Sequence, residues 1–145
     1  MEIRQAVESD FGQVLPLLTE LLRRTLENNQ ENRDNFTRAL KSDKRAVYVA
    51  DQDGKIVGLV TLTVYQKDAF YANSRKAEID EFIVSDSVRG SGVAGRLIER
   101  AIEHASERGC EFVELWSRLE NERAHSFYKK YGLSKLGFFL QKKMT

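Results

Sequence analysis

The stretch VRGSGVAGRL, residues 88–97, separates a strand-like apolar segment from a helix-like one, and it decides how the surrounding chain folds. It contains two overlapping glycine patterns. The pattern GxGxxG, residues 90–95, has the spacing of a dinucleotide-binding loop. The pattern RxxGxA, residues 89–94, has the composition of a different pyrophosphate-binding loop. The segments on either side of the loop distinguish the two.

The flanking segments do not fit a dinucleotide-binding loop. Such a loop begins directly after a strand and needs an acidic residue at the end of the next strand, about 20 residues later. Here the strand ends near Val84, so residues 85–89 intervene, and the acidic candidates Glu111 and Glu114 occupy the start and middle of the next strand. We therefore expect a cofactor other than NAD.

Hydrophobic periodicity predicts a mixed α/β sheet. The Asp53-Gly54 pair predicts a β-hairpin, and a helical crossover after residue 93 predicts a parallel strand pair. The predicted order is a strand at 3–7, a helix after Ser9 or Asp10 containing Pro16, a weaker helix ending near Leu40, strands at 46–50, 56–64 and 77–84, a helix from Val93 that ends at Gly109, a strand at 111–117, a helix from Asn121 to Gly132, and a final strand at 135–142.

Composition narrows the function classes. We expect one domain from 145 residues, and the net charge of +1 without a long basic run argues against nucleic-acid binding. One cysteine, Cys110, excludes an internal disulfide, and with two histidines it makes no metal-site pattern. The sequence shows no signal-peptide pattern and no 18-residue apolar run, so we expect a cytoplasmic protein that does not insert into membranes.

The glycine loop suits an anionic ligand. Gly90 and Gly92 allow the backbone to approach a ligand closely, and the helix beginning near Val93 directs unpaired N–H groups into the loop. Arg89 adds a positive charge. A plain turn between a strand and a helix would explain a lone GxG equally well, so the neighbouring sequence has to support the anion site.

A second motif, NERAHSFYKKYGL at residues 121–133, supplies that support. Together with IVSDSVRGSGVA at residues 83–94, it resembles the GCN5-related N-acetyltransferase (GNAT) superfamily. The family's cofactor loop is matched by Arg89, Gly92 and Ala94, and its later signature by Asn121, Ala124, Phe127, Tyr128 and Gly132. Asp86, Ala94 and Leu133 depart from the usual residues without removing a backbone N–H from the loop.

The resemblance implies a fold in which two central parallel strands splay apart, and an enzyme that takes acetyl-CoA as its co-substrate. It implies that the amine of an acceptor attacks the thioester directly. It places the cofactor contacts on Phe82, Ile83, Val84, Arg89, Gly90, Ser91, Gly92, Val93, Ala94, Gly95, Asn121, Ala124, Tyr128 and Lys130.

The chemistry requires a base for the amine and an acid for the departing thiolate. The resemblance assigns these roles to Glu78 and Tyr128. Strand alternation puts Glu78 and Asp80 on one face and Glu81 on the other, so a neighbouring carboxylate or a water chain remains an alternative base. Tyr128 could instead be a packing residue beside Phe127.

Three other side chains have a structural and a functional interpretation. A buried, inert thiol is the favoured interpretation of Cys110, against a covalent acyl-cysteine. We expect His104, on a helix face with arginines, to be solvated. Trp116 either packs in the core or lines the acceptor pocket.

The acceptor is left open between three hypotheses: a small primary amine, a protein or peptide amine, and acyl-CoA binding without catalysis. Weak similarity to aminoalkylphosphonate N-acetyltransferases favours the first. A carboxylate-lined acceptor site would also favour it, whereas an open groove would favour the second. The family is often dimeric, so a homodimer is among the expected states.

Overall fold

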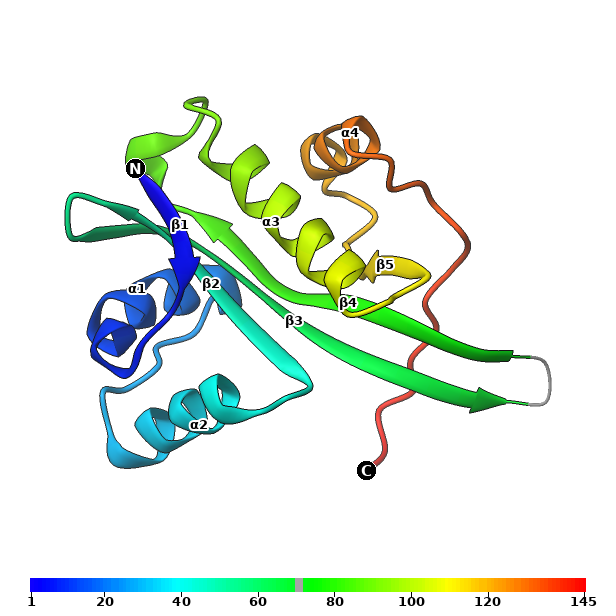
Figure 1. Ribbon diagram of the computed structural model, residues 1–145, viewed down its shortest axis with the longest axis horizontal. Coiled ribbons are helices and arrows are strands. Elements are labelled where there is room, and N and C mark those ends of the chain that lie inside the picture. The colour runs from blue at the N-terminus through cyan, green and yellow to red at the C-terminus, as the bar shows by residue number, and fades with distance from the viewer. Residues whose placement is uncertain (70–71) are drawn as a thin grey trace.

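The computed structural model describes residues 1–69 and 72–145 and contains a five-stranded sheet in the order β1-β2-β3-β4-β5 (Figure 1). Neighbouring strands are antiparallel except for β4 and β5, which are parallel as predicted. The strands are β1 (Glu2–Gln5), β2 (Arg45–Gln52), β3 (Lys55–Ala69), β4 (Ala72–Val84) and β5 (Phe112–Leu115), and the helices are α1 (Phe11–Leu22), α2 (Gln30–Lys41), α3 (Val93–Glu107) and α4 (Glu122–Lys130). The mixed α/β architecture is confirmed.

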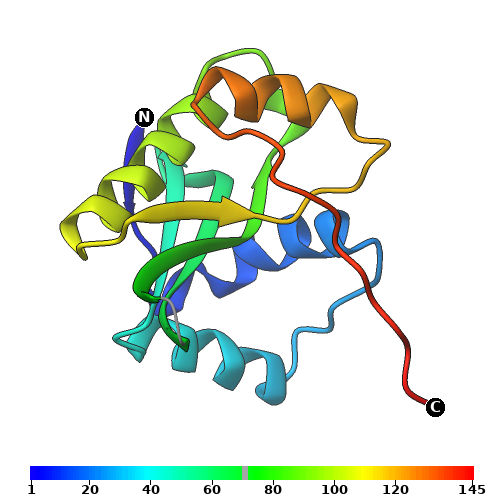
Figure 2. The same ribbon diagram turned by 90° about the vertical axis from the view of Figure 1, so that its right-hand side faces the viewer.

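Helices cover both faces of the sheet (Figure 2). On one face, α1 and α2 contribute Val14, Leu17 and Ala39 to a buried cluster with side chains of β2, β3 and β4. On the other face, α3 contributes Leu97, Ile98 and Ala101 to a larger cluster, and apolar residues of α4 pack against it. The alternation of apolar side chains along the strands supplies both clusters.

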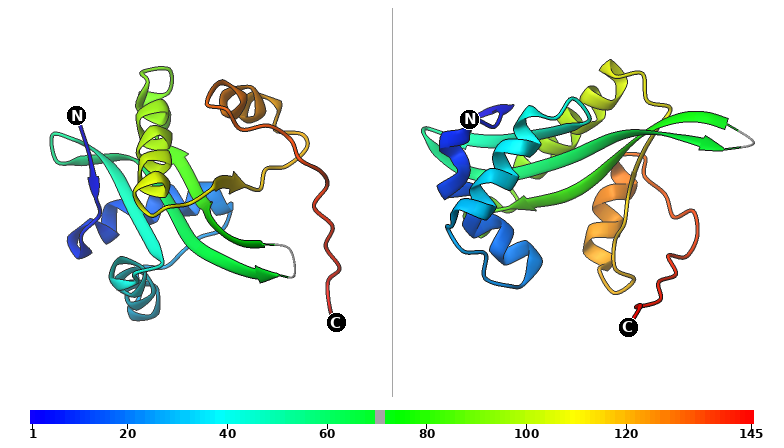
Figure 3. Two further views of the ribbon diagram at one scale, coloured as in Figure 1. Left: turned by 45° about the vertical axis from the view of Figure 1, so that its right-hand side comes forward. Right: turned by 90° about the horizontal axis from the view of Figure 1, so that it is seen from below.

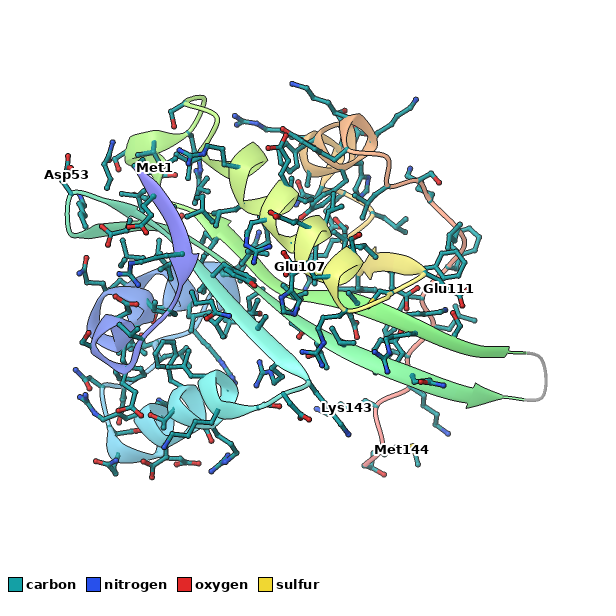
Figure 4. All side chains as sticks on the ribbon, viewed as in Figure 1. Met1, Asp53, Glu107, Glu111, Lys143 and Met144 are labelled. Atoms are coloured by element: carbon teal, nitrogen blue, oxygen red, sulfur yellow. The ribbon has the colours of Figure 1, made fainter. Side chains whose placement is uncertain are left out.

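The predicted hairpin between β2 and β3 is confirmed. Its two central residues, Asp53 and Gly54, have φ values of 52° and 87°, as a tight two-residue turn requires. The amide of Gly54 donates to a carboxylate oxygen of Asp51 over 2.8 Å. The turn lies at one extremity of the molecule (Figure 4).

Helix α3 also begins and ends where the sequence predicts. Gly92 caps its start with a φ of 88°, and Gly109 follows its end with a φ of 70°. The expectation for His104 was wrong, because this side chain is buried and its Nδ1 lies 2.8 Å from the Tyr48 hydroxyl. Burial lowers the pKa of His104. Its spacing from Leu97 and Ala101 places it on the apolar stripe, and this was the signal that would have identified it.

The predicted final strand at 135–142 does not form. Residues 133–145 follow an irregular course after α4, without a strand partner in the described part of the chain. The predicted strand at 111–117 shortens to Phe112–Leu115. A strand requires a neighbour for its hydrogen bonds, so its formation depends on what lies beside the segment as well as on its apolar pattern.

None of the described helices is long and apolar enough to cross a bilayer.

The contact between α3 and α4 depends on Gly95. A Cβ atom at Gly95 would lie 2.3 Å from the Tyr131 hydroxyl oxygen. We expect Gly95→Ala to destabilise the fold by about 1–3 kcal/mol, measured by urea unfolding, because the aromatic side chain has to shift. Tyr131→Phe removes the clashing oxygen and should recover part of the loss in the double variant.

Gly12→Ala is the matched control, because a Cβ at Gly12 in α1 meets no atom within 4 Å. Alanine there should leave stability unchanged or raise it by up to about 1 kcal/mol. Equal effects of alanine at the two positions would contradict the packing role of Gly95.

Candidate active site

The last two strands of the sheet, β4 and β5, diverge from each other (Figure 3). They pair only from Lys76 opposite Phe112 to Ile79 opposite Leu115, where β5 ends. Strand β4 continues to Val84 and pairs there with β3 alone among the described strands. Because backbone polar groups need partners, the free edge of residues 80–84 can bind an extended ligand that carries amide groups.

A β-bulge in β4 changes the predicted arrangement of its carboxylates. Thr61 pairs with Glu81 and Leu62 with Ile79, so Asp80 has no residue opposite it. The bulge shifts the alternation of side chains between the two faces of β4 by one residue. Glu81 therefore lies on the same face as Glu78 and Asp80, and the expectation that it points to the other face was wrong.

Hydrogen bonds to β3 support this geometry. The hydroxyl of Thr63 donates to Asp80 over 2.6 Å, and the hydroxyl of Thr61 donates to Glu81. The two threonines are two residues apart and so share one face of β3. They were not predicted as site residues, although the alternation of Thr61, Thr63 and Tyr65 contains the signal.

A fourth carboxylate joins the group from β5. Glu114 lies opposite Glu78 in the parallel register and accepts a hydrogen bond from the Tyr65 hydroxyl. The ammonium nitrogen of Lys76 lies 3.6 Å from its second oxygen. We call Glu78, Asp80, Glu81 and Glu114 the carboxylate face; it occupies the side of the sheet that α1 and α2 cover elsewhere.

Two groups on this face have shifted proton affinities. Burial, followed by the charges of Asp80 and Glu114, raises the pKa of Glu78. Burial and the hydrogen bond to Glu114 raise the pKa of Tyr65. A carboxyl group with a raised pKa is a better proton acceptor when it is ionised, so Glu78 has the properties of a general base.

The glycine loop has an open, anion-attracting backbone. Gly90 and Gly92 have φ values of 81° and 88°, and a Cβ at either would meet no atom within 4 Å. The first hydrogen bond of α3 runs from Arg96 to the carbonyl of Gly92, so the N–H groups of residues 93–95 have no helical acceptor. With the positive end of the helix dipole, they favour a phosphate group there.

The side chains of the loop are already engaged. Arg89 is paired with Asp86 and lies 3.1 Å from a carboxylate oxygen of Glu20 in α1. The amide and hydroxyl of Ser91 both donate to the Val88 carbonyl. In this conformation the loop therefore offers an anion its backbone amides, while Ser91 directs its donors elsewhere.

Helix α4 places Tyr128 above the free end of β4. The side chain of Asn121, where the predicted helix begins, caps the helix by accepting from the amide of Ala124 over 3.3 Å. The ring of Tyr128 packs edge-on against Phe82 at 6.2 Å between centroids. Burial raises the pKa of Tyr128, so its hydroxyl remains protonated at neutral pH. Tyr128 and Glu78 thus approach β4 from opposite faces of the sheet.

The remaining candidates divide between this region and other parts of the surface. Lys130 is exposed at the end of α4, which meets the start of α3 where Tyr131 contacts Gly95. Burial raises the pKa of Cys110, which disfavours the thiolate that a nucleophile needs. Trp116 is 53% exposed and packs against Phe139 instead of the core.

Comparison with known proteins identifies the family of this arrangement. The family model described as "Acetyltransferase (GNAT) family" matches residues 15–133. An uncharacterised N-acetyltransferase of Archaeoglobus fulgidus is 33% identical over 92% of both chains. The aminoalkylphosphonate N-acetyltransferase of Salmonella typhimurium is 31% identical over 94% of this chain and 87% of that protein.

The fold matches solved structures over nearly its whole length. A crystal structure described as a transcriptional regulator from Bacillus halodurans superimposes with a TM-score of 0.89, at 26% identity and over 99% of both chains. The matched segment includes the glycine loop, the diverging strands and α4. On the strength of the family match and of these relatives, the chain belongs to the GNAT family of N-acetyltransferases.

Proposed function

We propose that the protein transfers the acetyl group of acetyl-CoA to the primary amine of a small cationic molecule by direct attack. One feature of the geometry supports this most strongly. The free edge of β4 runs between the glycine loop on one side and the carboxylate face on the other. A cofactor that bridges the two would bring an acyl group to the carboxylates.

The residues present fit acetyl-CoA. The amides of Gly90, Gly92, Val93, Ala94 and Gly95 would bind the pyrophosphate, with Arg89 and Lys130 contributing charge. Phe82, Ile83 and Val84 would pair with the amides of the pantetheine arm. Asn121 and Ala124, at the start of α4, would lie beside that arm, and Ser91 would contact the cofactor only after its bonds to Val88 rearrange. When bound, acetyl-CoA supplies the acyl group as a thioester.

Glu78 would take the proton from the attacking amine. An alkyl ammonium has a pKa of about 10, so the amine has to be deprotonated before it can attack at neutral pH. The raised pKa of Glu78 narrows the gap between donor and acceptor. An N–H of Ile83 or Val84 would stabilise the oxyanion that forms at the acyl carbon.

Tyr128 would donate a proton to the departing sulfur. A thiol has a reference pKa of about 8.5 and a phenol one of about 10, so proton transfer from an ordinary phenol to a thiolate is uphill by about 2 kcal/mol, which is within reach of a general acid. Burial against Phe82 keeps this phenol protonated. Its position across the sheet from Glu78 would separate the acid from the base, so the two would not exchange the proton directly.

The carboxylate face supports a cationic acceptor. Among the side chains that the structure describes, one cation pairs with these four acidic groups, namely Lys76, which lies 3.6 Å from Glu114. This excess of negative charge attracts an ammonium group and repels an anion. The aminoalkylphosphonate enzyme acts on an amine that carries a phosphonate, so we infer that its substrate preference does not extend to this chain, despite 31% identity.

The acceptor preference can be measured by thiol release from acetyl-CoA. At neutral pH we expect a simple diamine to be acetylated with a higher kcat/KM than an aminoalkylphosphonate of equal length, and raised salt to weaken that preference. Acetyl-CoA should raise the melting temperature, by an amount that corresponds to about 2.7 kcal/mol at 100 times its Kd, while NAD should not. No stabilisation by acetyl-CoA would exclude the proposal.

Glu78→Gln should lower kcat by about 10²–10⁴-fold and leave acetyl-CoA binding intact. The same variant should be more stable than wild type at neutral and alkaline pH. Because folding raises the pKa of Glu78 above the reference of 4.5, the folded state binds more protons between 4.5 and the folded pKa, and stability falls as pH rises there. The variant should therefore melt at a higher temperature than wild type at about pH 8, with the gap closing at about pH 4.

Glu99→Gln is the control for charge removal, because Glu99 is exposed on α3 outside the proposed site. It should change neither activity nor this pH dependence. A Glu78→Gln variant with full activity would exclude Glu78 as the base.

Tyr128→Phe should lower kcat by about 10²-fold or more while the KM for acetyl-CoA stays close to the wild-type value. Tyr131→Phe removes a hydroxyl from the same helix and should retain activity. If the two variants behave alike, Tyr128 packs the helix and does not act as the acid.

A further inference from the structure

The charged side chain of the glycine loop, Arg89, is held by two carboxylates from different elements. One terminal guanidinium nitrogen, Nη2, lies 3.1 Å from Oε1 of Glu20 in α1, which stands 69 residues earlier in the chain. The other, Nη1, pairs with Asp86, which begins a short 3₁₀ turn (Asp86–Val88) directly before the loop. Both terminal nitrogens of Arg89 are therefore engaged by carboxylates of the protein itself.

These contacts oppose the binding of an anion at the loop. A guanidinium group binds a phosphate most strongly when it offers two parallel N–H donors. A phosphate that takes both terminal nitrogens of Arg89 has to compete with both Glu20 and Asp86. Until it does, two negative charges balance the single positive charge of Arg89, and the loop attracts an anion mainly through its backbone amides.

Glu20 also connects the loop to the other face of the sheet. It lies in the last turn of α1, which ends at Leu22. About one turn earlier in the same helix, Leu17 packs in the buried cluster that contains Ile83, a residue of the free edge of β4. One end of α1 therefore contacts both the free edge of β4 and the glycine loop, on the side of the sheet that carries the carboxylate face.

We propose that Glu20 and Asp86 form a latch on Arg89, which opens when the pyrophosphate of acetyl-CoA binds at the glycine loop. In the closed state, the two carboxylates neutralise Arg89 and lower the affinity of the loop for a polyanion. In the open state, Arg89 pairs with phosphate and releases Glu20, so occupation of the loop changes the contacts at the end of α1. Glu20 is thus a positioning residue that acts on the cofactor through Arg89. The latch rests on the proposed function, because it requires acetyl-CoA at this loop.

Calorimetric titration with coenzyme A, in the absence of an acceptor, measures the latch independently of catalysis. The side chains of Arg89 and Glu20 are 45% and 48% exposed, and ion pairs at such positions have small effects. We therefore expect Glu20→Gln to lower the Kd for coenzyme A by about 2- to 5-fold. Asp86→Asn should act in the same direction. Glu99→Gln, a charge removal on the exposed surface of α3, should leave the Kd unchanged.

Glu20→Asp distinguishes the latch from simple repulsion between a carboxylate and the phosphates. The shorter side chain keeps the negative charge but withdraws it by about 1.5 Å, the length of one carbon–carbon bond, which breaks the pair with Arg89. A latch predicts that this variant binds coenzyme A as tightly as Glu20→Gln, whereas repulsion alone predicts the wild-type Kd. In an Arg89→Gln background, neither substitution of Glu20 should lower the Kd.

Amide hydrogen exchange tests the connection to α1. In wild type, coenzyme A should speed the exchange of residues 20–22 at the end of α1, because the ligand releases Glu20 from Arg89. In Glu20→Gln, the same amides should exchange faster before any ligand is added and should not respond to coenzyme A.

Three results would overturn the latch: a Kd that Glu20→Gln raises or leaves unchanged, a Glu20→Asp variant with the wild-type Kd, or exchange at residues 20–22 that coenzyme A does not alter. Failure of the proposed function has a different signature. If coenzyme A binds neither wild type nor any variant, the cofactor assignment of the loop is rejected and the latch with it. If coenzyme A binds wild type and the Glu20 variants with one Kd, the latch alone is rejected.

Discussion

The site depends on the point at which β4 and β5 stop pairing. Four residue pairs hold the strands together, and beyond them β4 has a free edge while the chain after β5 turns towards α4. The start of α3 is held against the same part of the sheet at Gly58, where a Cβ would lie 2.8 Å from Leu97. Close packing at this glycine brings the loop amides to the end of the free edge. Sheet geometry, helix position and ligand access are therefore set together.

Hydroxyl groups beside the carboxylate face stabilise its negative charges. Four acidic side chains on adjacent strands repel one another, and such repulsion opposes folding. Hydroxyl groups of Thr61, Thr63 and Tyr65 donate to Glu81, Asp80 and Glu114, respectively. Glu78 has no such donor among the described residues, and burial, followed by the charges of Asp80 and Glu114, raises its pKa. Within one face, three carboxylates accept hydrogen bonds from hydroxyl groups of β3, and Glu78 accepts none from the described residues.

Features that depend on the preferences of single residues could be predicted from the sequence. The Asp53-Gly54 turn, the glycine ends of α3 and the Asn121 cap each follow from backbone preferences of single residues. Two errors arose from interactions with distant segments. The bulge at Asp80 depends on the register with β3, and strict alternation cannot predict it. The final strand was predicted from its apolar pattern, but residues 133–145 pair with no strand in the described part of the chain.

Because of the bulge at Asp80, the carboxylate face depends on the number of residues in β4 as well as on their identity. Loss of this one codon would restore regular alternation between Ile79 and Val84. Thr61 would still lie opposite Glu81 and Leu62 opposite Ile79, so Glu81 would stay on the carboxylate face and Phe82 beside Tyr128. An in-frame deletion of three bases would therefore remove one carboxylate together with the bulge and leave the register of every remaining residue with β3 unchanged.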